Sequence, residues 1–188
     1  AAGRMCVVKG ALPGEMISAC VLGKRKGQIV AIAETIQTAV DERTEPFCTV
    51  FPRCGGCSTQ QWEYREQLRF KERWVRHELS KHELLCESFL PTQHGSTTGF
   101  RRRARLGVRW VDKVGSAYVG FRETFGSYVV DMNMCPTLVS GLAELIGPLR
   151  DLVTCMSTPK RIPQVELVAG DKVRALVLRH LDPLSAKD

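Results

Sequence analysis

Four cysteines carry the clearest potential for chemistry in this sequence, because thiolates are ligands that soft metals prefer. Three of them are spaced as C-x5-C-x2-C, and the fourth stands much later, directly before a proline. They are Cys48, Cys54, Cys57 and Cys135. The two thiolates three residues apart can hold one metal because the short loop turns both sulfurs inward. Gly55 and Gly56 suit that loop, since glycine permits positive φ and brings backbone amides close to sulfur.

Two kinds of metal centre fit this spacing. An iron–sulfur cluster is favoured because Cys-Pro is typical of the last ligand in ferredoxin-type sequences. A four-cysteine zinc site stays open, although zinc sites usually have a second close pair and Cys135 has no cysteine near it. A thioredoxin-like C-x-x-C is disfavoured because no βαβ pattern surrounds it. The gap of five residues also differs from the C-x3-C-x2-C of radical-SAM clusters. An electron carrier is a further possibility, but no feature indicates a redox partner.

The composition is that of a globular protein with a basic balance. The chain has 188 residues and a formal net charge of +7, which is compatible with a polyanionic partner but does not prove one. The sequence shows neither a secretory signal nor an apolar run long enough to cross a membrane. We therefore expect a cytoplasmic monomer with no membrane partner and without disulfides. The other cysteines are interpreted as small buried hydrophobic residues; they are Cys6, Cys20, Cys86 and Cys155.

Arginines give the second chemical signal. From Phe100 the sequence alternates with period two, which predicts a strand with apolar residues on one face and arginines on the other. The apolar set is Phe100, Ala104, Leu106, Val108 and Trp110, and the opposite set is Arg101, Arg103, Arg105 and Arg109. Arg102 breaks the alternation and should point the other way. Residues 99–111 contain no acid, so we favour nucleic-acid contact over a solvated face.

These residues need elements that position them. Residues 5–8, 16–22 and 28–36 predict strands of a small partial β-barrel, whose basic hairpin tip carries Lys24, Arg25 and Lys26. Ser58 and Gln61 predict a capping box that opens a long helix. Residues 117–122, 128–132, 164–168 and 172–179 predict strands, and Pro136 precedes a leucine-rich helix that Pro148 kinks or divides. Residues 184–188 predict the first turn of another helix, so we expect the protein to continue. No catalytic motif is present.

In order, the motifs match a known family. They are C-x5-C-G-G-C, F-R-R-R-A-R-L, V-V-D-M-N-M-C-P, Q-V-E-L-V and L-R-H-L-D-P-L-S, preceded by the partial barrel. This series resembles the N-terminal half of the RumA/RlmD-type 23S ribosomal RNA uracil-C5 methyltransferases. The likeness extends over nearly the whole chain, which makes it far more specific than any single motif.

The resemblance implies an α+β architecture of two parts. Residues 1–45 would form a partial TRAM domain, which is an OB-like barrel that binds RNA, and residues 46–188 a central RNA-binding α/β domain with antiparallel strands. Cys48, Cys54, Cys57 and Cys135 would hold a 4Fe–4S cluster. The ribosomal RNA contacts that we predict are Arg101, Arg102, Arg103 and Arg105, together with the hairpin tip at Lys24, Arg25 and Lys26.

The family's chemistry belongs to a further, Rossmann-like domain that we expect to lie outside this chain. There S-adenosylmethionine is bound, and a cysteine attacks C6 of a uracil so that C5 can accept the methyl group. Reaching C5 requires an unstacked or flipped base. No catalytic or methyl-donor residue is therefore predicted here. The alternative hypothesis is a non-enzymatic, zinc-containing RNA-binding module.

Overall fold

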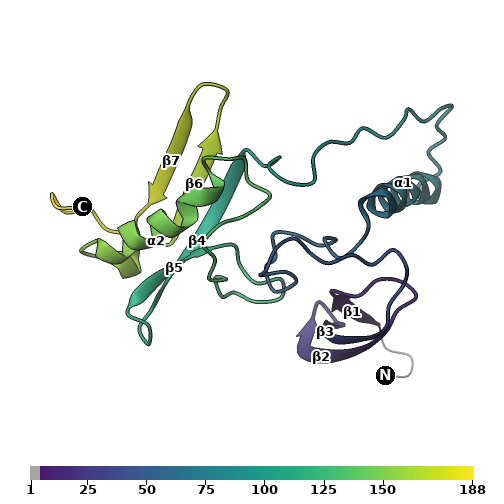
Figure 1. Ribbon diagram of the computed structural model, residues 1–188, viewed down its shortest axis with the longest axis horizontal. Helices are drawn as coiled ribbons and strands as arrows, with labels where there is room; N and C mark the ends of the chain where they lie inside the picture. Colours follow the sequence, from purple (N-terminus) through teal and green to yellow (C-terminus); the bar gives the residue numbers. More distant parts are fainter. Residues whose placement is uncertain (1–4) are drawn as a thin grey trace. The chain divides into compact units, whose positions relative to one another are not determined.

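The computed structural model describes residues 5–188, which fold as two compact units (Figure 1). The first unit comprises residues 5–46 and 59–96 of the described chain, and the second comprises residues 47–58 and 97–188. The α+β class is confirmed, but the described strands close no barrel. The division into domains at residue 45 stays a prediction, and residues 1–4 of the predicted first domain lie outside the described residues.

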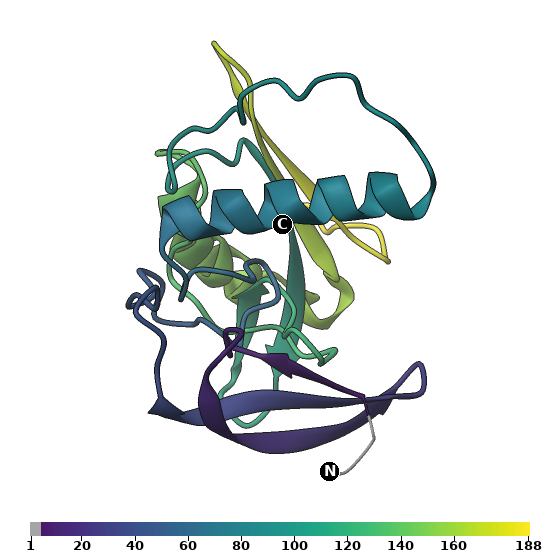
Figure 2. The ribbon, with the colours of Figure 1, turned by 90° about the vertical axis from the view of Figure 1, so that its right-hand side faces the viewer.

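The first unit contains a three-stranded sheet of order β1-β3-β2. The strands β1 (Cys6–Lys9), β2 (Met16–Arg25) and β3 (Gln28–Thr38) confirm the three predicted strands. β2 and β3 form the long purple hairpin in Figure 2. Arg25 pairs with Gln28 across a two-residue turn in which Lys26 and Gly27 both have positive φ (46° and 79°). This is the backbone that a type I′ hairpin turn requires, and it exposes the basic tip.

A single long helix, α1 (Tyr64–Lys81), follows in the same unit. Its N-cap is Glu63, whose side chain accepts a hydrogen bond from the backbone N–H of Arg65. The predicted start at Ser58 is wrong, and no capping box forms there. Gln61 is instead buried in a turn, where its backbone carbonyl accepts a hydrogen bond from Thr44 N–H at 2.8 Å. Gln61 is thus paired with Thr44 outside the helix, and it does not take part in a capping box.

The second unit is built on an antiparallel four-stranded sheet of order β5-β4-β6-β7. Its elements are β4 (Arg103–Val111), β5 (Ser116–Gly120), a 3-10 turn η1 (Ala143–Leu145), α2 (Ile146–Cys155), a 3-10 turn η2 (Pro159–Arg161), β6 (Gln164–Ala169) and β7 (Arg174–Arg179). The strands predicted at residues 117–122, 164–168 and 172–179 are confirmed as β5, β6 and β7, and β4 pairs antiparallel with β5 as β6 does with β7.

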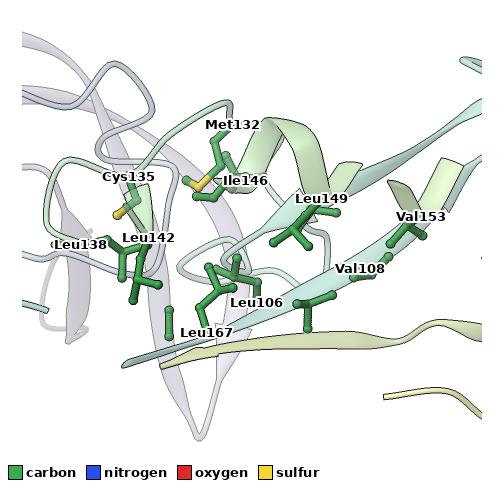
Figure 3. Close-up of a cluster of buried hydrophobic side chains, with 14 of the residues drawn as sticks. Leu106, Val108, Met132, Cys135, Leu138, Leu142, Ile146, Leu149, Val153 and Leu167 are labelled. Carbon is green, nitrogen blue, oxygen red and sulfur yellow. The ribbon is translucent and has the colours of Figure 1, made fainter. Parts of the chain in front are cut away.

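The core of this unit lies between one face of the sheet and α2 (Figure 3). Leu106 and Val108 of β4 and Leu167 of β6 pack with Ile146 and Leu149 of α2. Of the predicted apolar face, Ala104, Leu106 and Val108 are buried and Trp110 is partly buried against the core, whereas the first position is not. Phe100 precedes β4 and is 53% exposed, so its assignment to the core face was wrong.

Three further predictions in this unit are wrong. Residues 128–132 form only one isolated bridge, between Val129 and Arg122, and no strand. Residues 136–142 form turns, and α2 begins later, so Pro148 lies in its first turn, where a missing N–H leaves no hydrogen bond unmade. Residues 184–188 form a turn and no helix. Among the helices of residues 5–188, none is long and apolar enough to cross a membrane.

Candidate metal centre and arginine strand

The loop that carries three of the cysteines is fixed by backbone hydrogen bonds. Cys54 N–H donates to the carbonyl of Val50 at 2.9 Å, and Phe51 N–H donates to that of Cys48 at 3.1 Å. The loop is also tied to a later segment, because Gly55 N–H donates to the carbonyl of Arg122 at 2.8 Å. The three cysteines are consequently held on a structured loop rather than on a free one.

The two glycines between Cys54 and Cys57 are needed for close packing. A Cβ atom at Gly55 would lie 2.9 Å from the carbonyl oxygen of Arg122, and one at Gly56 would lie 3.3 Å from the ring of Phe121. Neither glycine has positive φ, so that part of the prediction is wrong. The predicted approach of an amide to sulfur is present, since Gly56 N–H donates to Cys54 Sγ at 3.4 Å.

Cys135 reaches the same unit from a different segment. Its thiol is buried (6% exposed), at the end of the core cluster seen in Figure 3. Cys135 Sγ and Thr137 Oγ1 lie 3.2 Å apart, within hydrogen-bonding distance for sulfur. Leu138 N–H donates to the Cys135 carbonyl at 3.1 Å and closes a turn over Pro136. Thr137 is a neighbour that sequence reasoning missed, although its place two residues after Cys135 was visible.

The structure brings the four thiols into one neighbourhood. Burial raises the pKa of the Cys48 thiol, and the nearby Cys135 and Cys57 raise it further because thiolates repel one another. Burial likewise raises the pKa of Cys54, to which Cys57, Cys135 and Cys48 all add, while the Gly56 amide lowers it. Four thiols within electrostatic reach of one another are a donor set that suits a soft metal.

The thiols are not, however, arranged as a finished metal site. Within residues 5–188, no group of three or more His, Cys, Asp or Glu side chains is disposed to hold a metal ion. The chemistry of the four thiols therefore suits a soft metal, but their arrangement does not by itself show a metal site.

The remaining cysteines were predicted to be buried, and this is wrong. Cys6, Cys20, Cys86 and Cys155 are all exposed and carry free thiols. Cys6 and Cys20 lie on strands of the first unit's sheet, and Cys155 ends α2. Apolar sequence neighbours indicated burial, but these positions face away from the cores of their units.

The arginine strand has the predicted alternation. Arg103 and Arg105 are exposed beside buried Ala104 and Leu106. Residues 99–111 contain no acid, but the neighbouring strand β6 supplies one, because Glu166 lies opposite Arg105. Glu166 lies 2.5 Å from Arg103 and 3.9 Å from Arg105, so both arginines share one carboxylate. The alternating Q-V-E-L-V segment was the signal that could have revealed this partner.

Arg101 and Arg102 make contacts inside the second unit. The Arg101 guanidinium donates to the carbonyl of Gly56 at 3.2 Å and lies 5.3 Å from the centre of the Phe121 ring. Arg102, which precedes β4, pairs with Asp171 at 2.8 Å, and its predicted opposite direction stays a prediction. The RNA contacts at these four arginines and at the exposed tip of the first unit's hairpin stay predictions.

No family model matches the chain. It is 41% identical over 187 residues to the protein named "23S rRNA (uracil(1939)-C(5))-methyltransferase RlmD" of Bordetella avium. The aligned region covers 99% of this chain and 39% of that protein. The proteins of the same name from Thiobacillus denitrificans and Hahella chejuensis are 40% and 37% identical over 187 residues, with 43% and 42% of their lengths covered.

The chain thus spans about two fifths of the length of the curated relatives it matches. The match leaves almost no residue of this chain outside it. The resemblance seen in the ordered motifs is confirmed: by sequence, this chain corresponds to the N-terminal portion of the RlmD-type 23S rRNA (uracil-C5)-methyltransferases.

Proposed function

We propose that this chain is the RNA-binding, 4Fe–4S-bearing part of an S-adenosylmethionine-dependent methyltransferase that forms 5-methyluridine in 23S ribosomal RNA. The observation that carries the proposal is the match of 99% of the chain to relatives with that printed activity. No residue of this chain is assigned to methyl transfer, and the methyl donor is proposed only for the whole protein. We propose that the protein acts as a cytoplasmic monomer.

The four thiols support the cluster assignment. Cys48, Cys54 and Cys57 lie on one loop, Cys135 lies on another segment, and all four belong to the second unit. When bound, the cluster would supply four iron–thiolate bonds that cross-link these two segments. The protein's own part is to bury Cys54 and Cys135 and to hold the loop through its hydrogen bond to Arg122. We infer that the role of the cluster is structural and that it supports RNA recognition.

RNA binding is supported by two basic features. Arg103 and Arg105 project from the face of β4 opposite the core, where planar guanidinium groups can bind phosphates. In the first unit the exposed hairpin tip carries Lys24 and Lys26 beside Arg25. We propose that this unit is a TRAM-like RNA-binding domain and that both features contact ribosomal RNA.

Anaerobic purification of the chain tests the cofactor. We expect brown protein with iron and acid-labile sulfide in equal amounts and a broad absorbance that bleaches on reduction. Cys54→Ser and Cys135→Ser should each lose most of the iron, whereas Cys155→Ser, which removes an exposed thiol, should retain it. Colourless protein with one tightly bound zinc would instead support the zinc module.

Methylation of the whole protein tests the activity. The chain alone should bind an RNA that contains the target uridine without transferring a methyl group. The full-length protein should transfer the radioactive methyl group of S-adenosylmethionine to that RNA. Methyl transfer by the chain alone would contradict the assignment of the chemistry to another domain.

A further inference from the structure

The face of the second unit's sheet that points away from α2 is here called the arginine face. It carries residues of several strands. Paired residues of neighbouring strands project on the same side of a sheet. Register therefore places Arg179 of β7 on this face, because Arg179 pairs with Gln164 and Gln164 pairs with Gly107. Gly107 lies in β4 with the same parity as Arg105 and Arg109.

Gly107 interrupts the row of arginines on β4. Arg105 and Arg109 are four residues apart, which is about 13 Å along a strand. A Cβ atom at Gly107 would lie 3.0 Å from Val129 Cγ2 and 4.0 Å from Arg122 Cγ. The missing side chain thus leaves room for a separate segment of the chain, which brings Val129 and Arg122 onto the arginine face between the two arginines of β4.

This segment is held in place by its own hydrogen bonds. Val130 N–H donates to the Phe121 carbonyl at 2.9 Å, and Glu123 N–H donates to the Tyr128 carbonyl at 3.0 Å. Arg122 is exposed, and its guanidinium donates to the carbonyl of Ser127 at 3.4 Å. Arg122 therefore stands beside the gap at Gly107 with an oriented, solvent-accessible guanidinium.

The charges of the arginine face are only partly compensated. Glu166 pairs with Arg103 and Arg105. Asp112 lies near Arg109 but forms its ion pair with Lys160 at 2.6 Å.

Within residues 5–188, three arginines of this face form no ion pair with an acid. They are Arg109, Arg122 and Arg179. Guanidinium groups that lack carboxylate partners and share one exposed face are suited to bidentate binding of phosphates.

We propose that Arg109, Arg122 and Arg179 bind phosphates of the RNA backbone and extend the surface begun by Arg103 and Arg105 across three elements. This inference rests on the proposed RNA-binding function and adds two residues, Arg122 and Arg179, that the alternating strand did not indicate. The ligand chemistry is that of phosphodiesters, so these residues position RNA and do not select a base.

Binding of a labelled, uridine-containing RNA oligonucleotide to the chain at several salt concentrations tests the proposal. Arg122→Gln and Arg179→Gln should each weaken binding several-fold and reduce the slope of log K against log salt by about 0.7. Arg122→Lys and Arg179→Lys should restore most of the slope because the charge is kept. Arg161→Gln is the matched control, since it removes one exposed arginine that pairs with Asp182.

The outcomes separate the two proposals. A wild-type chain that binds no RNA would overturn the proposed function and this inference together. A wild-type chain that binds RNA, with glutamine variants that keep its affinity and salt slope, would overturn the inference alone. Equal losses in Arg161→Gln and in the two test variants would show an effect of net charge and would also overturn it. Far-ultraviolet circular dichroism of each variant confirms that the chain is folded.

Discussion

The guanidinium of Arg101 donates a hydrogen bond to the carbonyl oxygen of Gly56, with 3.2 Å between nitrogen and oxygen. Gly56 lies between Cys54 and Cys57, so this bond fixes the tip of the cysteine loop. The backbone of Arg101 is bonded at the same time to the segment that carries Cys135, because Arg101 N–H donates to the Thr137 carbonyl at 2.8 Å. Arg101 thereby connects the two segments that bear the thiols.

Replacing Arg101 should loosen the cysteine loop. Arg101→Gln removes the guanidinium donor of Gly56 at a cost of about 1 kcal/mol. In the metal-free chain, we expect Cys54 to be alkylated about fivefold faster, measured by mass spectrometry of iodoacetamide-treated protein. The alkylation rate of Cys54 in Arg101→Lys should lie between the rates in wild type and in Arg101→Gln.

Arg161→Gln serves as the control for this experiment because its ion pair with Asp182 lies outside the cysteine segments. An unchanged alkylation rate of Cys54 in Arg101→Gln would show that the bond to Gly56 does not hold the loop. Weaker RNA binding with an unchanged alkylation rate would support the RNA contact predicted for Arg101.

Substitution of Gly55 should disturb the cysteine loop through packing. Gly55→Ala places a methyl group 2.9 Å from the carbonyl oxygen of Arg122, which belongs to backbone and can move little. We expect the free energy of unfolding to fall by about 2 kcal/mol, measured by urea denaturation. Gly95→Ala is the control, because no atom lies within 4 Å of the added methyl group. Equal stabilities of the two variants would contradict the close packing at Gly55.

The strands were predictable because their signals are local. Alternation of Ala104, Leu106 and Val108 with arginines predicted the buried and exposed faces of β4, and the basic segment of residues 24–26 predicted the tip of the first hairpin. Segments whose structure depends on distant partners were not predictable. Gln61 matched a capping box, but its backbone pairs with Thr44 instead.

The candidate site shows the same division. Cysteine spacing predicted a shared role for the four thiols, which stays a prediction, and the structure adds that Cys57 and Cys135 act electrostatically on Cys48 and Cys54. The bond from Arg101 to Gly56 spans 45 positions, and the pair of Arg103 with Glu166 spans 63. The contact of Arg101 with Gly56 has no signal in the local sequence, because it depends on which loops become neighbours. For Glu166, the alternating Q-V-E-L-V segment indicates a strand, but it does not indicate that this strand lies beside β4.

The ion pair of Glu15 and Arg43 should make the first unit sensitive to acid. The Glu15 side chain is fully buried, and its hydrogen bond from Arg43 holds the pKa of the carboxyl below its ordinary value of 4.5. A lowered pKa stabilises the fold above the ordinary value, and this contribution is lost as pH falls through the folded-state pKa. Urea denaturation at pH 7 and pH 3 should therefore show a smaller difference in Glu15→Gln than in wild type.

Removal of this ion pair at pH 7 should itself cost about 2 kcal/mol, because Arg43 loses its charged partner. Glu34→Gln, at an exposed position of β3, should keep the wild-type pH dependence. If Glu15→Gln and wild type lose the same stability on acidification, the pair does not control the acid response.

Glu166 should weaken RNA binding in the wild-type chain because it shares its charge with two arginines of the arginine face. Glu166→Gln keeps a hydrogen-bond acceptor for Arg103 but removes the negative charge 3.9 Å from Arg105. We expect RNA affinity to rise several-fold at low salt and the salt slope to steepen by about 0.7, as one more guanidinium becomes available to phosphate. Arg103→Gln and Arg105→Gln should shift both quantities in the opposite direction.

Asp182→Asn separates a local effect from one of net charge, since it removes an acid whose ion pair is with Arg161. If Glu166 acts through the arginine face, Asp182→Asn should leave the affinity and the salt slope close to those of wild type. Equal gains in the two variants would mean that RNA responds to the overall charge of the chain. A fall in affinity on Glu166→Gln would mean that the carboxylate's main effect is to orient Arg103 and Arg105, which would reverse the expected sign.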